Sequence, residues 1–164
     1  MRELERICEP WDNKVKKPTW PGHNWYFSTM DTALITYSGE LRTEATHVRS
    51  GQQIITDAPV DNKGKGAAFS PTDLLATSLA TCMITTIAIM AEGKGITIDK
   101  MEARVIKHMA SDPRRVQRVE IHLSVGGKDL GDKEKIIIER TARTCPVAIS
   151  LHPDLVQDFH FSFN

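Results

Sequence analysis

The stretch SPTDLLATSLATCMITTIAIMAEGKG, residues 70–95, decides the fold of this chain. Residues 74–91 contain no charged residue, no glycine and no proline, which predicts one uninterrupted helix. At a rise of roughly 1.5 Å per residue, that helix would be about 27 Å long. Ser70 and Asp73 have the spacing of a capping box at its start, and Gly93 marks its end. The sequence therefore predicts a long central helix that is hydrophobic nearly all round.

A helix this apolar has to be covered on every side. A membrane is one possible cover, because the run is just long enough to span a bilayer. No basic cluster stands beside the run to set an orientation, however, and five hydroxyl-bearing residues interrupt it. These are Thr77, Ser78, Thr81, Thr85 and Thr86. We therefore expect no membrane partner and a helix that lies in the interface of a homodimer, since a chain of this size can hardly cover it alone.

The composition suits one folded domain, with 164 residues of which 40% are hydrophobic and 26% charged. The 21 basic and 21 acidic residues cancel, so we expect no nucleic acid partner. The opening residues, MRELERICEPWDNK, lack the apolar core of a signal peptide, which favours a cytoplasmic protein. Three cysteines without a close pair fit reduced thiols better than structural disulfides.

Residues 1–31 differ from the rest of the chain. They are punctuated by prolines and contain Cys8 and all three tryptophans, Trp11, Trp20 and Trp25. We interpret them as a Trp/Pro-rich extension whose aromatic side chains dock onto the body, with Cys8 as a bystander; the alternative is an aromatic arm that binds a ligand. Residues 32–164 are then the folded domain.

Alternating apolar residues predict the remaining elements of that domain. Residues 32–60 should form a meander of three short strands. After the central helix, we expect two long strands (96–110 and 116–127), a helix (132–144), a short helix opened by Pro146 and a closing strand (156–163). The predicted order is βββ-α-ββ-α-α-β, an α+β domain with two sheets around helices.

The candidate chemistry rests on two cysteines. Cys145 precedes the short helix, whose amides could converge on its sulfur, and Arg140 and Arg143 are close in sequence. Both effects favour the thiolate. Cys82 lies in the middle of the apolar helix, where burial should raise its pKa unless a cation reaches it. On this local argument Cys145 would be the more acidic thiol.

The segments SPTDLLATSLATC (70–82) and TCPVAISL (144–151), at this separation, resemble the OsmC/Ohr family of osmotically induced proteins and organic hydroperoxide reductases. The resemblance covers residues 32–164. It implies the OsmC-like fold, in which two antiparallel sheets surround a long central helix in an intertwined dimer. It also implies that Cys82 is the peroxidatic cysteine and Cys145 the resolving one.

Two positions depart from the pattern of the active hydroperoxide reductases. Those proteins place a glutamate ten residues before the peroxidatic cysteine, where it orients an arginine over the thiolate. Here that position is Thr72, and Asp73 stands next to it. By resemblance, the arginine would be Arg42, with Arg49 as the second candidate.

The resemblance implies an organic hydroperoxide as substrate and an external reductant, either a lipoyl-bearing protein or another small dithiol. This chemistry requires no metal and no organic cofactor. Apolar walls from Leu75, Leu79, Ile89 and Phe69 would favour organic over hydrogen peroxide.

Other functions stay open. The main alternative is a non-enzymatic OsmC-like protein that binds a small apolar ligand in a cavity at the dimer interface. A hydrolase with Cys145 as nucleophile and His152 as base lacks an evident third group. The histidines form no i, i+4 pair and no HExxH motif, so the sequence gives no indication of a zinc site.

Overall fold

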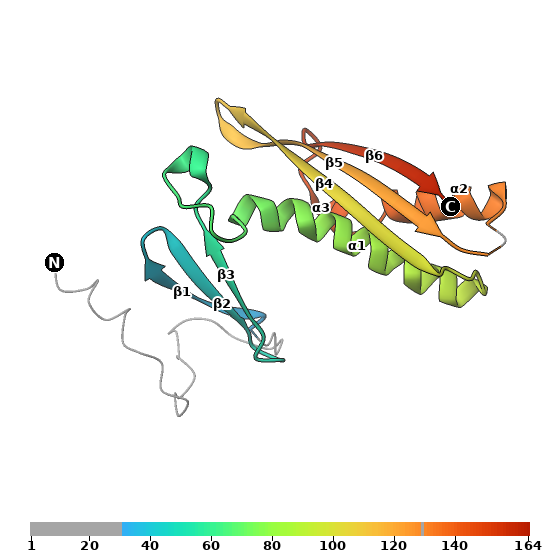
Figure 1. Cartoon of the computed structure of the whole chain (residues 1–164), viewed down its shortest axis with the longest axis horizontal. Coiled ribbons are helices and arrows are strands. Elements are labelled where there is room, and N and C mark those ends of the chain that lie inside the picture. Colours follow the sequence, from blue (N-terminus) through green and yellow to red (C-terminus); the bar gives the residue numbers. More distant parts are fainter. Residues whose placement is uncertain (1–30, 129) are drawn as a thin grey trace, which may run out of the picture. The chain divides into compact units, whose positions relative to one another are not determined.

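The computed structural model describes residues 31–128 and 130–164 (Figure 1). Within it, Thr32–Asn164 forms one compact unit, and this is the unit described below. The tryptophans and Cys8 of the expected N-terminal extension lie outside the described residues.

The first sheet is the predicted meander. It consists of β1 (Ala33–Gly39), β2 (Arg42–His47) and β3 (Gln53–Asp57), paired antiparallel in the order β1-β2-β3. The tight turn between β1 and β2 has positive φ at Gly39, Glu40 and Leu41, with values of 85°, 51° and 63°. Arg42 follows this turn directly and is the first residue of β2.

The central helix α1 (Pro71–Lys94) confirms the prediction from the decisive stretch. It follows a loop that contains the short 3-10 helix η1 (Val60–Asn62). The side chain of Ser70 accepts from the backbone N–H of Asp73 at 3.1 Å, and the Asp73 carboxylate accepts from the Ser70 N–H at 2.8 Å. This reciprocal capping box satisfies two amides that a helix start otherwise leaves without partners. Gly95 ends the helix with φ 67°, a left-handed conformation that glycine adopts without strain.

The second sheet contains β4 (Lys100–Ser111), β5 (Arg114–Gly126) and β6 (Val156–Phe163) in that order. Between β5 and β6 the chain forms α2 (Asp132–Arg143) and α3 (Pro146–Ser150). The predicted element order and the α+β class are confirmed. One detail differs from the expected pair of antiparallel sheets, because β6 runs parallel to β5. The two helices act as the crossover that parallel neighbours require.

The core lies between the helices and one face of the second sheet, and α1 contacts β4, β5, α2 and α3 (Figure 1). On α1, the fully buried side chains Leu79, Met83 and Ile87 follow one another at helical spacing. On β5, every second residue is buried from Val119 to Val125. The intervening residues of β5 point away from the core, which gives this sheet one apolar and one polar face.

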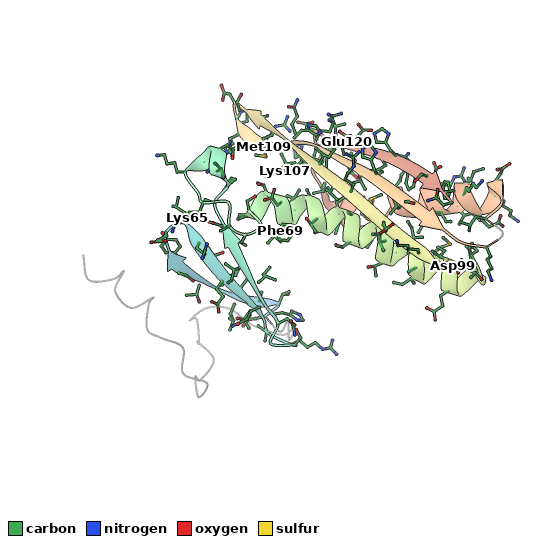
Figure 2. All side chains as sticks on the ribbon, viewed as in Figure 1. Lys65, Phe69, Asp99, Lys107, Met109 and Glu120 are labelled. Carbon is green, nitrogen blue, oxygen red and sulfur yellow. The ribbon has the colours of Figure 1, made fainter. Side chains whose placement is uncertain are left out.

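The polar face of the second sheet carries an interlocked set of charged and imidazole side chains. Hydrogen bonds from His122 and His108, the first at 2.7 Å, together with the nearby Arg118 guanidinium, lower the pKa of Glu120 to about 2. Arg118 also donates to Asp158 of β6 at 3.2 Å. Figure 2 shows Glu120 on the side of the sheet turned away from α1.

Two surfaces within the described residues are exposed and rich in small or apolar side chains. On α1, the small residues Ser78, Thr81, Thr85 and Ala88 form an exposed stripe at helical spacing, and Ile89 beside it is 66% exposed. The first sheet exposes large apolar side chains from β1 and β3: Ile35, Tyr37, Ile54 and Ile55. A three-stranded sheet without a covered apolar face is marginally stable in water, so these surfaces call for a cover.

Among the described residues, α1 is the one helix long and apolar enough to span a membrane, and 33% of its most apolar window is buried. The core helix of a soluble protein meets the same test. The continuous buried stripe from Leu79 to Ile87 favours a core helix over a membrane span.

We predict that Ser70→Ala lowers the free energy of unfolding by about 1 to 2 kcal/mol, because it removes the cap of α1. Urea denaturation followed by circular dichroism measures the change. The matched control is Ser150→Ala, whose exposed hydroxyl bonds only the Pro146 carbonyl of its own helix, and which should change stability by less than about 0.5 kcal/mol. Equal losses for the two variants would contradict a special role for the cap.

Candidate active site

The structure brings Cys82 of α1 and Cys145 together, although 62 residues separate them in the sequence. Their thiols are close enough for each to change the pKa of the other. Cys82 is partly exposed, whereas Cys145 is fully buried in the core. The pair therefore has one thiol that solvent can reach and a second thiol directly behind it.

Cys145 is held in place by the junction between α2 and α3. It is the N-cap residue of α3, with extended backbone angles, and Pro146 is the first residue of that helix, as predicted. Its sulfur accepts a hydrogen bond from the Ala148 N–H at 3.5 Å. The proline fixes the start of α3 immediately after the cysteine, so the thiol is aimed by backbone geometry.

The pKa of Cys82 is lowered by its hydrogen bonds. Burial alone would raise it, but the backbone N–H of Val147, the Cys145 thiol and the Thr86 hydroxyl together more than offset that effect. The Thr86 oxygen lies 3.9 Å from the Cys82 sulfur. The Val147 N–H and the Cys145 thiol can donate to a thiolate, and hydrogen bonds to the charged form favour it. The Thr86 hydroxyl donates to the Cys82 carbonyl oxygen at 2.7 Å, which is its shorter contact.

The pKa of Cys145 is raised, mainly by burial and also by its contact with Cys82. The local sequence argument, which made Cys145 the more acidic thiol, is therefore wrong for this arrangement. Arg143 does not approach the sulfur but lies over the rings of Phe159 and Phe161, at 5.4 and 5.5 Å from their centroids. Arg140 is exposed. The sequence argument assumed a cation and an accessible thiol at Cys145. Among the residues that the structure describes, no cation acts on this thiol, and the thiol is buried.

The two candidate arginines lie elsewhere within the described part of the chain. Arg42 pairs with Asp57 of β3, with 3.4 Å between its Nη2 and the Asp57 Oδ2. A hydrogen bond from the Ala67 N–H, and the Arg42 guanidinium, keep the pKa of the buried Asp57 below its usual range although burial opposes them. Arg49 is exposed in the turn after β2. A role for either arginine at Cys82 stays a prediction.

Asp73 has a partner that the sequence analysis missed. The Lys107 ammonium of β4 donates to Asp73 at 2.7 Å and to the Thr72 hydroxyl at 2.8 Å, over the first turn of α1 (Figure 2). Burial opposes ionisation of Asp73, but the hydrogen bonds from Lys107 and Ser70 lower its pKa overall. The available signal was a lysine two positions from Val105 and from Met109 in a predicted strand, because a partly buried lysine needs a partner.

A cavity of about 460 Å³ opens beside this cluster. The loop of residues 66–69, the α1 residues Asp73, Ala76 and Thr77, and the β4 residues Val105 and Lys107 line it. At 100° per residue, these α1 positions lie about half a turn around the helix axis from Cys82, so the cavity and the thiol pair are separate features. Of the expected apolar walls, Phe69 lines this cavity, whereas Leu79 is fully buried in the core.

The hydrolase alternative finds no support in the described residues. His152 is 73% exposed at its side chain and lies 3.7 Å from Asp154. Cys145 is buried and contacts Cys82 instead. Nucleophile and base are therefore not assembled.

The fold and the thiol pair define an OsmC-like α+β protein, and comparison with known families agrees. The family model for OsmC-like proteins matches residues 64–157. A crystal structure from Psychrobacter arcticus 273-4, provisionally described as an osmotic stress induced and detoxification response protein, is 54% identical with a TM-score of 0.78. The match covers 84% of this chain and 99% of that one. The chain therefore belongs to the OsmC family.

More distant solved structures share the fold. An organic hydroperoxide resistance protein OsmC from Legionella pneumophila is 16% identical, with a TM-score of 0.63 over 81% of this chain and 98% of that one. The organic hydroperoxide resistance protein OhrB of Bacillus subtilis is 18% identical, with a TM-score of 0.55 over 80% and 98% of the two chains. A search of curated proteins gives no significant match.

We predict that iodoacetamide at neutral pH modifies Cys82 several times faster than Cys145, because Cys82 is more exposed and its pKa is lowered. The rate at Cys82 should rise with pH and reach half of its maximum below pH 9.0, the ordinary value for a thiol. Peptide mapping by mass spectrometry after timed quenching separates the two sites.

A second variant is Thr86→Val, which preserves shape but removes the hydroxyl that lies 3.9 Å from the Cys82 sulfur and donates to the Cys82 carbonyl. It should move the alkylation midpoint of Cys82 to higher pH. Faster modification of Cys145 than of Cys82 would contradict the order of acidity described above.

Proposed function

We propose that this protein is a cytoplasmic, thiol-dependent peroxidase that reduces organic hydroperoxides in defence against oxidative stress. The observation that carries the proposal is the partly exposed Cys82 thiol, with its lowered pKa, in contact with a second, buried thiol. A peroxidatic cysteine has to be a thiolate that the peroxide can reach, and a resolving cysteine has to be adjacent. Cys82 and Cys145 meet these two requirements respectively.

The reaction balances with these two groups and a hydroperoxide. The Cys82 thiolate attacks one peroxide oxygen, the O–O bond breaks, and the alkoxide leaves as an alcohol after it takes a proton. Cys82 is then a sulfenic acid. The Cys145 thiol condenses with it, which forms the Cys82–Cys145 disulfide and releases water. The Val147 N–H stabilises the thiolate before attack.

An external dithiol has to reopen the disulfide. A lipoyl-bearing protein or another small dithiol can do so by attack on one sulfur, followed by closure of its own disulfide. The reaction uses no metal and no organic cofactor. The names of the Legionella and Bacillus relatives, both organic hydroperoxide resistance proteins, support the proposed substrate class.

The working unit is proposed to be a homodimer. The exposed stripe on α1 and the exposed apolar side chains of the first sheet are the surfaces that a second copy would cover. Within the described chain Arg42 is paired with Asp57. It could serve Cys82 of its own subunit after release from Asp57, or it could serve Cys82 of a second subunit. The intertwined arrangement expected for this family offers the second route.

Sedimentation equilibrium at micromolar concentration should give twice the mass of one chain, because a monomer would leave both apolar surfaces in water. Ile89→Glu places a charge beside the exposed stripe of α1 and should weaken the dimer. The exposed Ile136→Glu on α2 is the matched control and should not. A stable wild-type monomer would contradict the proposed assembly.

Stopped-flow mixing with cumene hydroperoxide should show rapid consumption of one peroxide per subunit in the absence of reductant. Cys82→Ser should abolish the reaction. Cys145→Ser should still consume peroxide, but Cys82 should then proceed to sulfinic acid because no resolving thiol remains.

In the wild type, peptide mapping should find the Cys82–Cys145 disulfide. In the chain-entropy model this cross-link stabilises the folded state by roughly 4 kcal/mol, so the melting temperature should rise.

The same experiment separates this proposal from a non-enzymatic protein that binds a small apolar ligand. A wild-type rate no higher than that of Cys82→Ser would favour the binding protein. So would peroxide treatment that overoxidises Cys82 and leaves Cys145 free. If the first turnover is fast and the second is slow with an added dithiol, that dithiol is an unsuitable reductant, and the peroxidase proposal stands.

A further inference from the structure

The outer face of the second sheet contains a cluster of histidines that the thiol chemistry does not use. His122 of β5 and His160 of β6 are direct partners in the parallel ladder, and Glu120 precedes His122 by two positions on the same face. The apolar residues Val119, Ile121 and Leu123 alternate with them and are buried in the core. The fold therefore fixes three side chains with metal-binding atoms on adjacent positions of two hydrogen-bonded strands.

The side chains converge as well as the backbone. One ligand atom from each of Glu120, His122 and His160 can be chosen so that all three lie within 4.8 Å of one another. The closest pair is Glu120 Oε1 and His122 Nε2, at 2.7 Å. The imidazole rings of His122 and His160 are stacked, with centroids 4.6 Å apart and an angle of 18° between their planes.

These distances match what a metal ion requires after a small adjustment. Two ligand atoms in a tetrahedral zinc site, each about 2.1 Å from the ion, lie about 3.4 Å apart. His160 can supply part of the adjustment, because its side chain is 51% exposed, but it has to turn out of its stack on His122 and its 3.2 Å contact with Asp158. Two imidazoles and one carboxylate also form a ligand set typical of divalent first-row transition metals, with positions left for water.

Two surrounding side chains resemble the outer support of metal ligands. His108 of β4 lies 3.0 Å from the second carboxylate oxygen of Glu120 and can orient that group. Asp158 lies 3.2 Å from His160 Nε2. When the ring turns and His160 binds the metal through Nδ1, the Asp158 carboxylate can orient the ring through Nε2. Arg118 acts in the opposite sense, because its guanidinium is 3.5 Å from Glu120 and competes with a cation for that carboxylate.

We propose that Glu120, His122 and His160 bind one divalent first-row transition metal ion, such as Zn²⁺, and that the ion links β5 to β6. The site is independent of the proposed peroxidase activity, because the thiol pair belongs to the core side of the sheet and the cluster to its outer side. Without an ion, the proton that His122 shares with Glu120 occupies the place of the metal.

Titration of the untagged full chain with Co²⁺ tests the proposal, because cobalt reports its own ligands. We expect one Co²⁺ per chain, visible d–d absorption, and no sulfur-to-cobalt charge-transfer band in the near ultraviolet. Calorimetry with Zn²⁺ should give the same stoichiometry. His122→Asn, His160→Asn and Glu120→Gln should each weaken binding at least about tenfold.

Two matched variants complete the test. His152→Asn removes an exposed histidine outside the cluster and should leave the affinity unchanged. Arg118→Gln removes the competing cation and should tighten binding, a result that nonspecific binding to surface histidines would not produce. Zn²⁺ should raise the melting temperature of the wild type by several degrees but not that of His160→Asn, whose fold without metal is checked by circular dichroism.

Several results would overturn the proposal. These are the absence of saturable binding, a sulfur-to-cobalt band that disappears in Cys82→Ser, and an affinity that His122→Asn and His160→Asn leave unchanged. In each case the cluster would serve only as a hydrogen-bonded network on the polar face of the sheet.

Discussion

The packing of one stripe of α1 against the second sheet fixes the orientation of α1 and therefore the positions of the two thiols. Leu79, Met83 and Ile87 are fully buried and share a core with alternate residues of β5. This contact fixes the rotation of α1 about its own axis. Cys82, one position before Met83, consequently faces α3 and the Val147 N–H. A rotation of α1 by one residue, about 100°, would separate the two thiols and expose part of the core.

The acidity of the two thiols depends on which of them the core encloses. A helix start and neighbouring arginines would favour a thiolate at Cys145 if the thiol were accessible. Instead Cys145 is fully buried, and its desolvation outweighs the hydrogen bond from Ala148. The start of α3 still contributes, but through the Val147 N–H, which reaches the sulfur of Cys82. The helix that begins after one cysteine thus stabilises the thiolate of the other.

The fold was largely predictable because its signals are local. The uncharged run before Ala91, the capping box at Ser70 and the proline after Cys145 each specify backbone conformation over a few residues. The direction of β6 was not predictable in this way, because strand direction depends on the path of the crossover through α2 and α3.

The candidate site was predictable only in part, for a related reason. The two cysteines could be selected by resemblance, but their order of acidity depends on burial, which neither local sequence segment shows. Lys107 was missed because its partners Asp73 and Thr72 lie more than thirty residues away. The histidine cluster was missed because metal ligands were sought at helical spacing, whereas Glu120 and His122 have the spacing of a strand and His160 comes from its neighbour.

The pairing of Asp73 with Lys107 explains how this chain can depart from the hydroperoxide reductase pattern at Thr72. An acidic residue near the start of α1 could orient an arginine only if its carboxylate were free to do so. Here one oxygen of Asp73 binds Lys107 and the other binds the N–H and hydroxyl of Ser70. Thr72 joins the same network as an acceptor for Lys107. The first turn of α1 is thus neutralised from within the chain, and the lowered pKa of Cys82 rests on donors that α3, Cys145 and Thr86 supply. In this arrangement an arginine would lower further a Cys82 pKa that the backbone N–H of Val147 already lowers. Loss of the arginine should therefore reduce the thiolate fraction of Cys82 without abolishing it.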